Sequence, residues 1–306
     1  MSKLAEQLKT YADSDYLPMH MPGHKRRMGD LGNPFFIDIT EIDGFDDLHH
    51  AEGILKQAEE RAAELYGSEE THYLVNGSTS GILAAISGCT AAGGTVLLAR
   101  NSHKSAYHAV LLRGLHVHYI YPQPAGKMGI NGPVTAENVD RLLEEHPETK
   151  MVYITSPTYD GVVSDVEQIA EVVHRRKLPL IVDEAHGAHF PFSEQFPKDS
   201  VSCGADVVIH SVHKTLPSLT QTALIHLNGD LINREKIRYF LGVYQSSSPS
   251  YVMMAGIDQC IEWVSSHRKE FDSFAQRLQE VRAELRKLQA LELLEVPGID
   301  TSKILL

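Results

Sequence analysis

Short apolar runs alternate along the chain with longer segments in which apolar residues recur every three or four positions. The short runs are rich in β-branched residues, which is typical of buried parallel strands, and the longer segments predict amphipathic helices. This alternation predicts an α/β fold with a mostly parallel, doubly wound sheet and helices on both faces. The predicted strands are residues 72–75, 95–99, 116–121, 151–155, 179–182, 205–209 and 222–227, and the last of them is a candidate for antiparallel pairing.

The helical segments have recognisable ends as well as apolar faces. Gly67 is suited to end a helix that starts at residue 52, and Ser164 and Glu167 form a capping box that starts another. Residues 293–296 and 303–306 have the composition of opening strands of a further domain. The predicted helices are residues 1–14, 52–66, 82–92, 106–113, 136–145, 164–177, 230–241, 252–264 and 271–288.

Polar residues follow two of the predicted strands directly. Asp183 follows the strand at 179–182, and Lys214 lies a few residues beyond the strand at 205–209. Open α/β sheets bind their ligands at the carboxyl ends of the strands. Pyridoxal phosphate requires a lysine that bonds to its aldehyde and a carboxylate that keeps its ring nitrogen protonated. The pair therefore suggests that cofactor.

Two further segments extend this interpretation. Residues 76–81, Asn-Gly-Ser-Thr-Ser-Gly, join a strand to a helix, and such a turn can bind an anion through backbone N–H groups, hydroxyls and the helix dipole. The alternative is a simple N-capped helix after a tight turn. His103 follows the strand at 95–99, where it is either an exposed loop residue or a ring that stacks on the cofactor.

Composition and charge restrict the class of protein. The chain has 306 residues, 42% hydrophobic and 22% charged, as expected of a globular protein with a substantial core. A formal charge of −12 argues against a general nucleic-acid-binding protein. Three scattered cysteines favour neither a disulfide framework nor a zinc site. With no signal peptide and no membrane-spanning run, a cytoplasmic location is the default.

The first fifty residues contain two clusters of unassigned role. Residues 19–27 are basic in an acidic protein, and they form either a solvated arm or an arm that reaches an anionic site in a partner subunit. Residues 43–47 are acidic and precede His49 and His50. A metal site is conceivable there, although adjacent histidines do not easily share one ion.

Two motifs point to other chemistries but lack their partners. Residues 183–186 spell Asp-Glu-Ala-His, as in the Walker B box of helicases, but the chain has no phosphate loop GxxxxGK[ST]. His186 and His189 resemble a pair of metal ligands, but no third ligand and no HExxH motif accompany them. We therefore expect no catalytic metal.

Taken together, these motifs resemble those of the Orn/Lys/Arg decarboxylase family, in particular its short branch from Gram-positive bacteria. The resemblance covers essentially the whole chain and implies the fold-type-I large domain of pyridoxal-phosphate-dependent transferases. The segments that carry it are MPGHK at 21–25, TEIDGFDDLHHAEG at 40–53, LVNGSTSG at 74–81, NSHKS at 101–105, SPTYDG at 156–161, VDEAHG at 182–187, SVHK at 211–214 and QSSSPSY at 245–251.

The resemblance implies a role for each matching position. Lys214 would bond to the cofactor aldehyde, Asp183 would pair with the ring nitrogen, and His103 would stack on the ring, which makes these three the expected catalytic residues. The remaining expected cofactor-binding residues are Ser78, Thr79, Ser211 and His213 at the phosphate, Thr158 at the ring edge, His186 near the cofactor at a position that varies within the family, and Ser246 and Ser247, which would reach the phosphate of a neighbouring subunit.

The implied activity is α-decarboxylation of arginine, lysine or ornithine, which gives a polyamine precursor, in a homodimer or larger homo-oligomer. The implied organisation is an arm at 1–50, a cofactor-binding domain at 51–265, and a linking helix at 266–306 that begins a C-terminal domain. Family members continue through that domain, so the resemblance implies that most of it is lacking here. The alternatives are an inactive pyridoxal-phosphate-binding protein and an enzyme of the aminotransferase or aldolase type.

Overall fold

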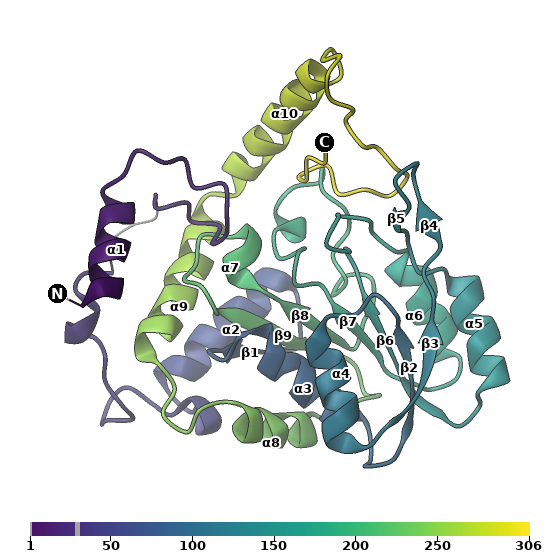
Figure 1. The fold of residues 1–306 in the computed structure, drawn as a ribbon. Helices are drawn as coiled ribbons and strands as arrows, with labels where there is room; N and C mark the ends of the chain where they lie inside the picture. Colours follow the sequence, from purple (N-terminus) through teal and green to yellow (C-terminus); the bar gives the residue numbers. More distant parts are fainter. Residues whose placement is uncertain (1, 28–30) are drawn as a thin grey trace.

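A seven-stranded sheet forms the centre of the protein in the computed structural model, which describes residues 2–27 and 31–306 (Figure 1). Met1 and residues 28–30 of the predicted arm lie outside the described residues. All neighbouring strands pair in parallel except β9, which runs antiparallel to both of its neighbours. The order across the sheet is β1 (Glu70–Leu74), β9 (Ala223–Leu227), β8 (Val207–His210), β7 (Leu180–Asp183), β6 (Thr149–Thr155), β2 (Thr95–Ala99) and β3 (His116–Ile120).

Helices cover both faces of this sheet because successive strand residues point to opposite sides. Tyr153 and Ile181 pack with Ile82 of α3 in one core cluster, whereas their neighbours Val152 and Val182 pack in another. The predicted mostly parallel, doubly wound sheet is therefore confirmed. One face carries α3 (Gly77–Cys89), α4 (Lys104–Arg113) and α8 (Arg234–Tyr244), and the other carries α5 (Ala136–Glu145), α6 (Val166–His174), α2 (Ile54–Tyr66) and α9 (Tyr251–Ser266).

Smaller elements lie at the margins of this core. In Figure 1, α10 projects away from the sheet at the top of the view, and α1 lies at the left. Among the described residues, no helix is long and apolar enough to cross a bilayer. These elements are α1 (Lys3–Ala12), η1 (Pro34–Phe36), η2 (Leu48–His50), β4 (Pro124–Ala125), β5 (Ile130–Asn131), η3 (Phe190–Phe192), α7 (Val212–Thr215) and α10 (Arg268–Leu285).

Several predicted helix boundaries were wrong, and α8, predicted from residue 230, begins at Arg234. The helix predicted from residue 82 begins at Gly77, because the Gly/Ser/Thr segment forms the first helical turn instead of a separate loop. The cap of α6 is Asp165, whose side chain accepts a hydrogen bond from the backbone N–H of Gln168. Ser164 is not available as the cap, because its hydroxyl accepts from the backbone N–H of Val134. This helix ends at His174 and does not reach residue 177.

The two strands predicted near the end of the chain do not form. Leu294 and Leu305 share one backbone hydrogen bond, and Ile299 forms an isolated antiparallel bridge with Val162. Buried Arg282 of α10 donates to the backbone oxygen of Lys303, 2.8 Å away. The segment therefore packs on α10 and on the loop after β6 without forming a strand.

The order of the strands determines where a ligand can bind. After β2 the chain moves outward to β3, and it then returns on the other side of β2 to form β6, β7 and β8. The order reverses between β2 and β6, and open α/β sheets bind ligands at the carboxyl ends of strands near such a reversal.

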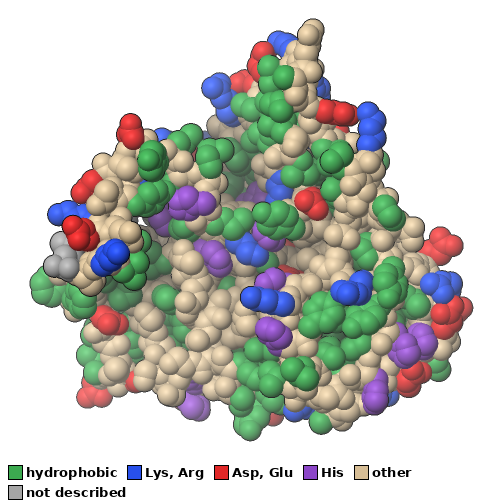
Figure 2. Space-filling model, in the orientation of Figure 1, with side chains coloured by type: hydrophobic (Ala, Val, Ile, Leu, Met, Phe, Trp, Pro, Cys, Tyr) green, Lys and Arg blue, Asp and Glu red, His purple; other side chains and the backbone are tan. Residues whose placement is uncertain are grey.

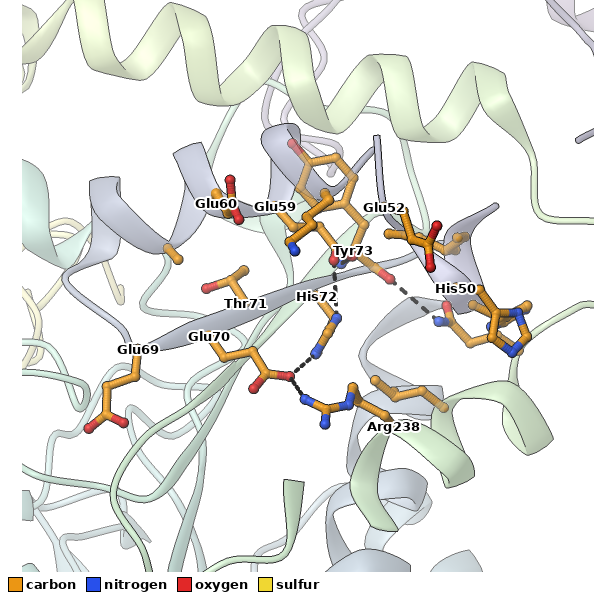
Figure 3. Close-up of a pocket in the computed structure, with 17 residues that line it drawn as sticks. His50, Glu52, Glu59, Glu60, Glu69, Glu70, Thr71, His72, Tyr73 and Arg238 are labelled. Carbon is orange, nitrogen blue, oxygen red and sulfur yellow. Dashed lines mark hydrogen bonds and ion pairs between the residues drawn. The ribbon is translucent and has the colours of Figure 1, made fainter. Parts of the chain in front are cut away.

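A separate cavity of about 530 Å³ lies along the β1 edge of the sheet (Figure 3). Its wall holds His72, whose Nδ1 is 3.1 Å from Glu59 and whose Nε2 is 2.6 Å from Glu70. Burial alone would lower the pKa of His72, but the two carboxylates raise it to about 9. Burial alone would raise the pKa of Glu70, but His72 and Arg238 lower it to about 2.

We expect His72→Gln to flatten the dependence of stability on alkaline pH. A histidine with a raised pKa stabilises the fold fully below its unfolded pKa of roughly 6.5, and this contribution disappears as the pH rises through the folded value. The free energy of unfolding should therefore fall between these two pH values, by at most about 1.4 kcal/mol per pH unit.

Urea unfolding at a series of pH values measures this slope. The matched control is His50→Gln, which removes an exposed histidine that also faces a carboxylate, Asp47. Equal slopes for the protein and the His72 variant would contradict the prediction.

Candidate active site

Lys214 lies on α7, a single helical turn that follows β8. Its backbone N–H donates to the carbonyl of Ser211, 3.1 Å away, which closes the turn between β8 and α7. The Nζ atom is half-buried and lies 3.0 Å from Nε2 of His186. Burial lowers the pKa of Lys214, and the charge of Asp183 offsets part of that effect.

Asp183 is the last residue of β7 and is buried, with 2% of its surface exposed. Its carboxylate accepts hydrogen bonds from the hydroxyl of Tyr153, at 3.1 Å, and from the backbone N–H of Ala185, at 3.2 Å. Burial raises the pKa of Asp183, and the attraction of Lys214 opposes that rise. A carboxylate in this position favours a cationic partner at the end of the sheet.

His103 caps α4 at the carboxyl end of β2 and is exposed. Its Nδ1 lies 3.3 Å from the backbone N of Ser105 and 2.7 Å from the hydroxyl of the same residue. Burial lowers the pKa of the His103 ring, and the charge of Asp183 raises it while that of Lys214 lowers it. The ring thus belongs to the same electrostatic cluster as the acid and the lysine.

The first turn of α3 meets the start of α7. The hydroxyls of Ser78 and Ser211 are in direct contact across this junction. Asn76 precedes the helix and makes no capping bond with its side chain, so the first N–H groups of α3, at Gly77 to Thr79, receive no side-chain cap. His213 bonds through Nδ1 to the carbonyl of Thr222, 2.8 Å away. Hydroxyls and uncapped N–H groups at a helix start are donors of the kind that bind a phosphate.

Lys303 is a site residue that the sequence reasoning missed. Its Nζ lies 3.1 Å from Nδ1 of His186 and donates to the carbonyl of Tyr159 at 2.7 Å. Burial lowers the pKa of Lys303 to about 8 and that of His186 to about 2, and for His186 the charge of Lys214 adds to the effect. No motif surrounds Lys303 in the sequence, so only the packing of the final segment brings it here.

The other predicted binding residues lie around this cluster. Thr158 is buried, and its hydroxyl accepts from the backbone N–H of Val162 within the loop after β6. The backbone N–H of Ser246 donates to the side chain of Asn76, so Ser246 lies beside the start of α3 in the same chain. Ser247 is exposed in the same loop. Figure 2 shows histidine and basic side chains gathered around a hollow between α1 and α10.

The basic segment at residues 21–25 packs against α7 of its own chain. The backbone N–H of Gly23 donates to the carbonyl of His213, 2.7 Å away. A Cβ atom at Gly23 would lie 2.4 Å from the carbonyl oxygen of Leu216. Neighbouring Arg26 donates to backbone carbonyls at the end of α1. The segment therefore supports the turn that carries Lys214.

The acidic segment at residues 43–47 has a structural role as a cap. The carboxylate of Asp46 accepts backbone N–H groups from Asp47, Glu52, Gly53 and Leu55, which fixes the start of α2. His49 and His50 diverge: His49 bonds to the carbonyl of Ser246 and His50 to Asp47.

One other group of side chains has the composition of a metal site. Among the described residues, His118, His146 and Glu148 place their possible ligand atoms within 4.8 Å of one another. The two rings stack with centroids 3.4 Å apart, and each faces Glu148. Glu148 directly precedes β6, so this group lies at the amino end of the strand, opposite the cluster around Asp183.

Known proteins resemble this chain in sequence and in fold. The family model for the major domain of Orn/Lys/Arg decarboxylases matches residues 3–303. The chain belongs to the Orn/Lys/Arg decarboxylase family. The uncharacterised protein YaaO of Bacillus subtilis is 42% identical over 252 residues, which cover 78% of this chain and 52% of YaaO. An arginine decarboxylase of the same organism is 34% identical over 259 residues, which cover 82% of this chain and 53% of that enzyme.

Solved structures give the same fold class. The constitutive lysine decarboxylase of Escherichia coli superposes with a TM-score of 0.74 at 21% identity, over 95% of this chain and 44% of that one. Serine palmitoyltransferase of Sphingomonas wittichii gives a TM-score of 0.60 at 18% identity, over 80% of this chain and 59% of that one. The fold is that of fold-type-I pyridoxal-phosphate enzymes, as predicted. This family member spans about half the length of the curated relatives that it matches.

We expect Gly23→Ala to destabilise the protein by about 1–3 kcal/mol, the usual cost of forcing a side chain into a packed region. The new methyl group would collide with the Leu216 carbonyl and push the segment away from α7. Urea unfolding measures the loss, and limited proteolysis of the arm measures its release.

Gly242→Ala is the matched control. Gly242 lies in the exposed face of α8, and a Cβ there meets nothing closer than 3.9 Å. Alanine also stabilises a helix by up to about 1 kcal/mol relative to glycine. Equal stability of the two variants would show that the packing of Gly23 against α7 contributes little.

Proposed function

We propose that this protein is a pyridoxal-phosphate-dependent decarboxylase that acts on a basic amino acid, arginine, lysine or ornithine, and yields a polyamine precursor. The observation that carries the proposal is the arrangement of Lys214 and Asp183 at adjacent strand ends. Each affects the pKa of the other, yet within the described chain the Nζ of Lys214 hydrogen-bonds to His186, and no direct ion pair joins it to Asp183. Family membership and the arginine decarboxylase relatives support the substrate class.

The side chains present fit the cofactor in three respects. A half-buried lysine lies beside a buried carboxylate, and the first turn of α3 has no side-chain cap. The buried hydroxyl of Thr155 has no hydrogen-bond partner among the described residues, and Thr155 is in register with Asp183 at the carboxyl end of β6. A buried polar group without a partner in the protein is suited to bind a polar ligand.

Each residue would then have one task. Bound pyridoxal phosphate supplies an aldehyde that captures amines and a ring that accepts the electrons released when carbon dioxide leaves the substrate. Lys214 would hold the cofactor covalently, and the Asp183 carboxylate would keep the ring nitrogen protonated. His103 would cover one face of the ring. Ser78, Thr79, Ser211 and His213 would bind the phosphate at the start of α3, and Thr158 and His186 would line the ring edge.

We further propose a cytoplasmic homodimer or larger homo-oligomer in which Ser246 and Ser247 contact the phosphate of the neighbouring subunit. Ser246 lies beside Asn76 at the start of α3 of its own chain, so the contact with a neighbouring phosphate rests on the family resemblance alone. In this proposal residues 51–265 form the cofactor-binding unit, residues 1–50 the arm, and residues 266–306 the link to a C-terminal domain.

The test begins with absorbance spectra of the protein mixed with pyridoxal phosphate. We expect a near-visible band that borohydride bleaches, and we expect Lys214→Ala to lack it. Lys104→Ala is the matched control, because Lys104 lies one residue from His103 but outside the contacts of Lys214. A band that survives in Lys214→Ala would contradict the assigned lysine.

Release of carbon dioxide from arginine, lysine and ornithine then tests the reaction. Asp183→Asn should lower the rate by roughly 10²- to 10⁴-fold, the usual effect of losing a group that controls a proton. A cofactor band without carbon dioxide from any of the three would favour a pyridoxal-phosphate-binding protein without decarboxylase activity. Conversion of the amino acid to a keto acid would favour an aminotransferase.

A further inference from the structure

Lys214, His186 and Lys303 form a row of three basic side chains. The imidazole of His186 lies between the two amines, with Nε2 3.0 Å from Lys214 Nζ and Nδ1 3.1 Å from Lys303 Nζ. The ring is 9% exposed, so water does not readily substitute for either contact. The first two residues follow β8 and β7, whereas Lys303 comes from the end of the chain.

The number of protons in this row is restricted by the ring. A neutral imidazole has one N–H group and one lone pair, and an imidazolium has two N–H groups and no lone pair. Two ammonium groups would need two lone pairs on His186, which neither form provides. Both contacts are hydrogen bonds only if at least one lysine is a neutral amine that accepts from the ring, so at most one of the two lysines carries a charge.

We propose that His186 and Lys303 relay a proton away from Lys214, so that Lys214 becomes the neutral amine that can attack an aldehyde. A proton leaves Lys214 Nζ for His186 Nε2 while the proton on His186 Nδ1 passes to Lys303 Nζ. The positive charge moves from Lys214 to Lys303, and no other reactant is consumed. The role rests on the proposed function, in which Lys214 bonds to the cofactor aldehyde.

Lys303 is well placed to keep the proton. Its Nζ donates to the carbonyl of Tyr159 at 2.7 Å and lies 5.6 Å from the centre of the Tyr159 ring. Asp300 and Asp160 also attract its charge. Burial lowers the pKa of both lysines, which brings the exchange into reach near neutral pH. The charged and titratable groups that face the row are Asp183, His103 and His213 around Lys214 and His186, and Asp160 and Asp300 around Lys303.

His186 and Lys303 act through Lys214 and are therefore positioning residues. The direct measure of the relay is the protonation state of Lys214. Competitive labelling with acetic anhydride, followed by peptide mass spectrometry, measures the fraction of neutral Lys214 as a function of pH in protein free of pyridoxal phosphate. We expect Lys303→Met to move the labelling midpoint of Lys214 upward by about one pH unit or more, because His186 can then accept a hydrogen bond from the charged Lys214 and no second cation faces the ring. At a fixed pH below the midpoint, each unit lowers labelling roughly tenfold.

Lys303→Arg reproduces the end state of the transfer. An arginine cannot accept the proton from His186, but it keeps the positive charge at position 303 and still donates to His186, so the midpoint of Lys214 should remain as low as in the unaltered protein. Lys127→Met, which removes an exposed lysine paired with Glu292, is the control for loss of a lysine elsewhere. An unchanged midpoint in Lys303→Met, or equal midpoints in the Met and Arg variants, would overturn the proposal.

Labelling without the cofactor also keeps this test independent of the proposed function. A shifted midpoint in protein that forms no cofactor band would support the relay and refute pyridoxal phosphate binding. A cofactor band together with an unshifted midpoint would refute the relay alone.

Discussion

The parallel pairing of β7 with β8 is the contact on which the candidate site depends. The register sets Asp183 opposite Ile209, so the acid lies at the end of one strand just where the next strand leads into α7 and Lys214. Both strands are buried on both faces, and a slip by one residue would turn Asp183 toward the opposite face of the sheet. The apolar packing that fixes the register therefore also fixes the chemistry.

A buried hydrogen-bond chain strengthens this arrangement. Glu184, the neighbour of Asp183, bonds to His210 at 2.7 Å, His210 bonds to His226 at 3.0 Å, and His226 bonds to Thr71 at 2.8 Å. Burial holds the pKa of His226 well below its usual range, so that ring is neutral. These hydrogen bonds form one continuous chain from β1 across β9 and β8 to the residue that follows β7. The chain thereby links strands β1, β9 and β8 to Glu184, the residue that follows Asp183.

The pattern of apolar and polar residues in the sequence was enough to predict the site residues that directly follow strands. It was not enough to predict residues that reach the site only because distant segments of the chain pack there. Apolar runs located β7 and β8, which identified Asp183 and Lys214. Tyr153, which bonds to Asp183, had the appearance of an ordinary strand residue, and Lys303 has no motif around it. The start of α3 was misjudged because glycine, serine and threonine favour turns and caps, whereas here tertiary packing holds them in the first helical turn.

The electrostatics of the cluster connect these observations. Burial raises the pKa of Asp183 and lowers the pKa values of Lys214 and Lys303, so each group is shifted toward its uncharged form. A ligand with a cationic ring nitrogen beside Asp183 would lower the pKa of that carboxyl and keep it ionised. Its anionic phosphate would lie at the start of α3, and the contact with His186 would keep the amine of Lys214 neutral. The site would then hold Asp183 in its ionised form and Lys214 in its uncharged form, although burial favours the uncharged form of both groups.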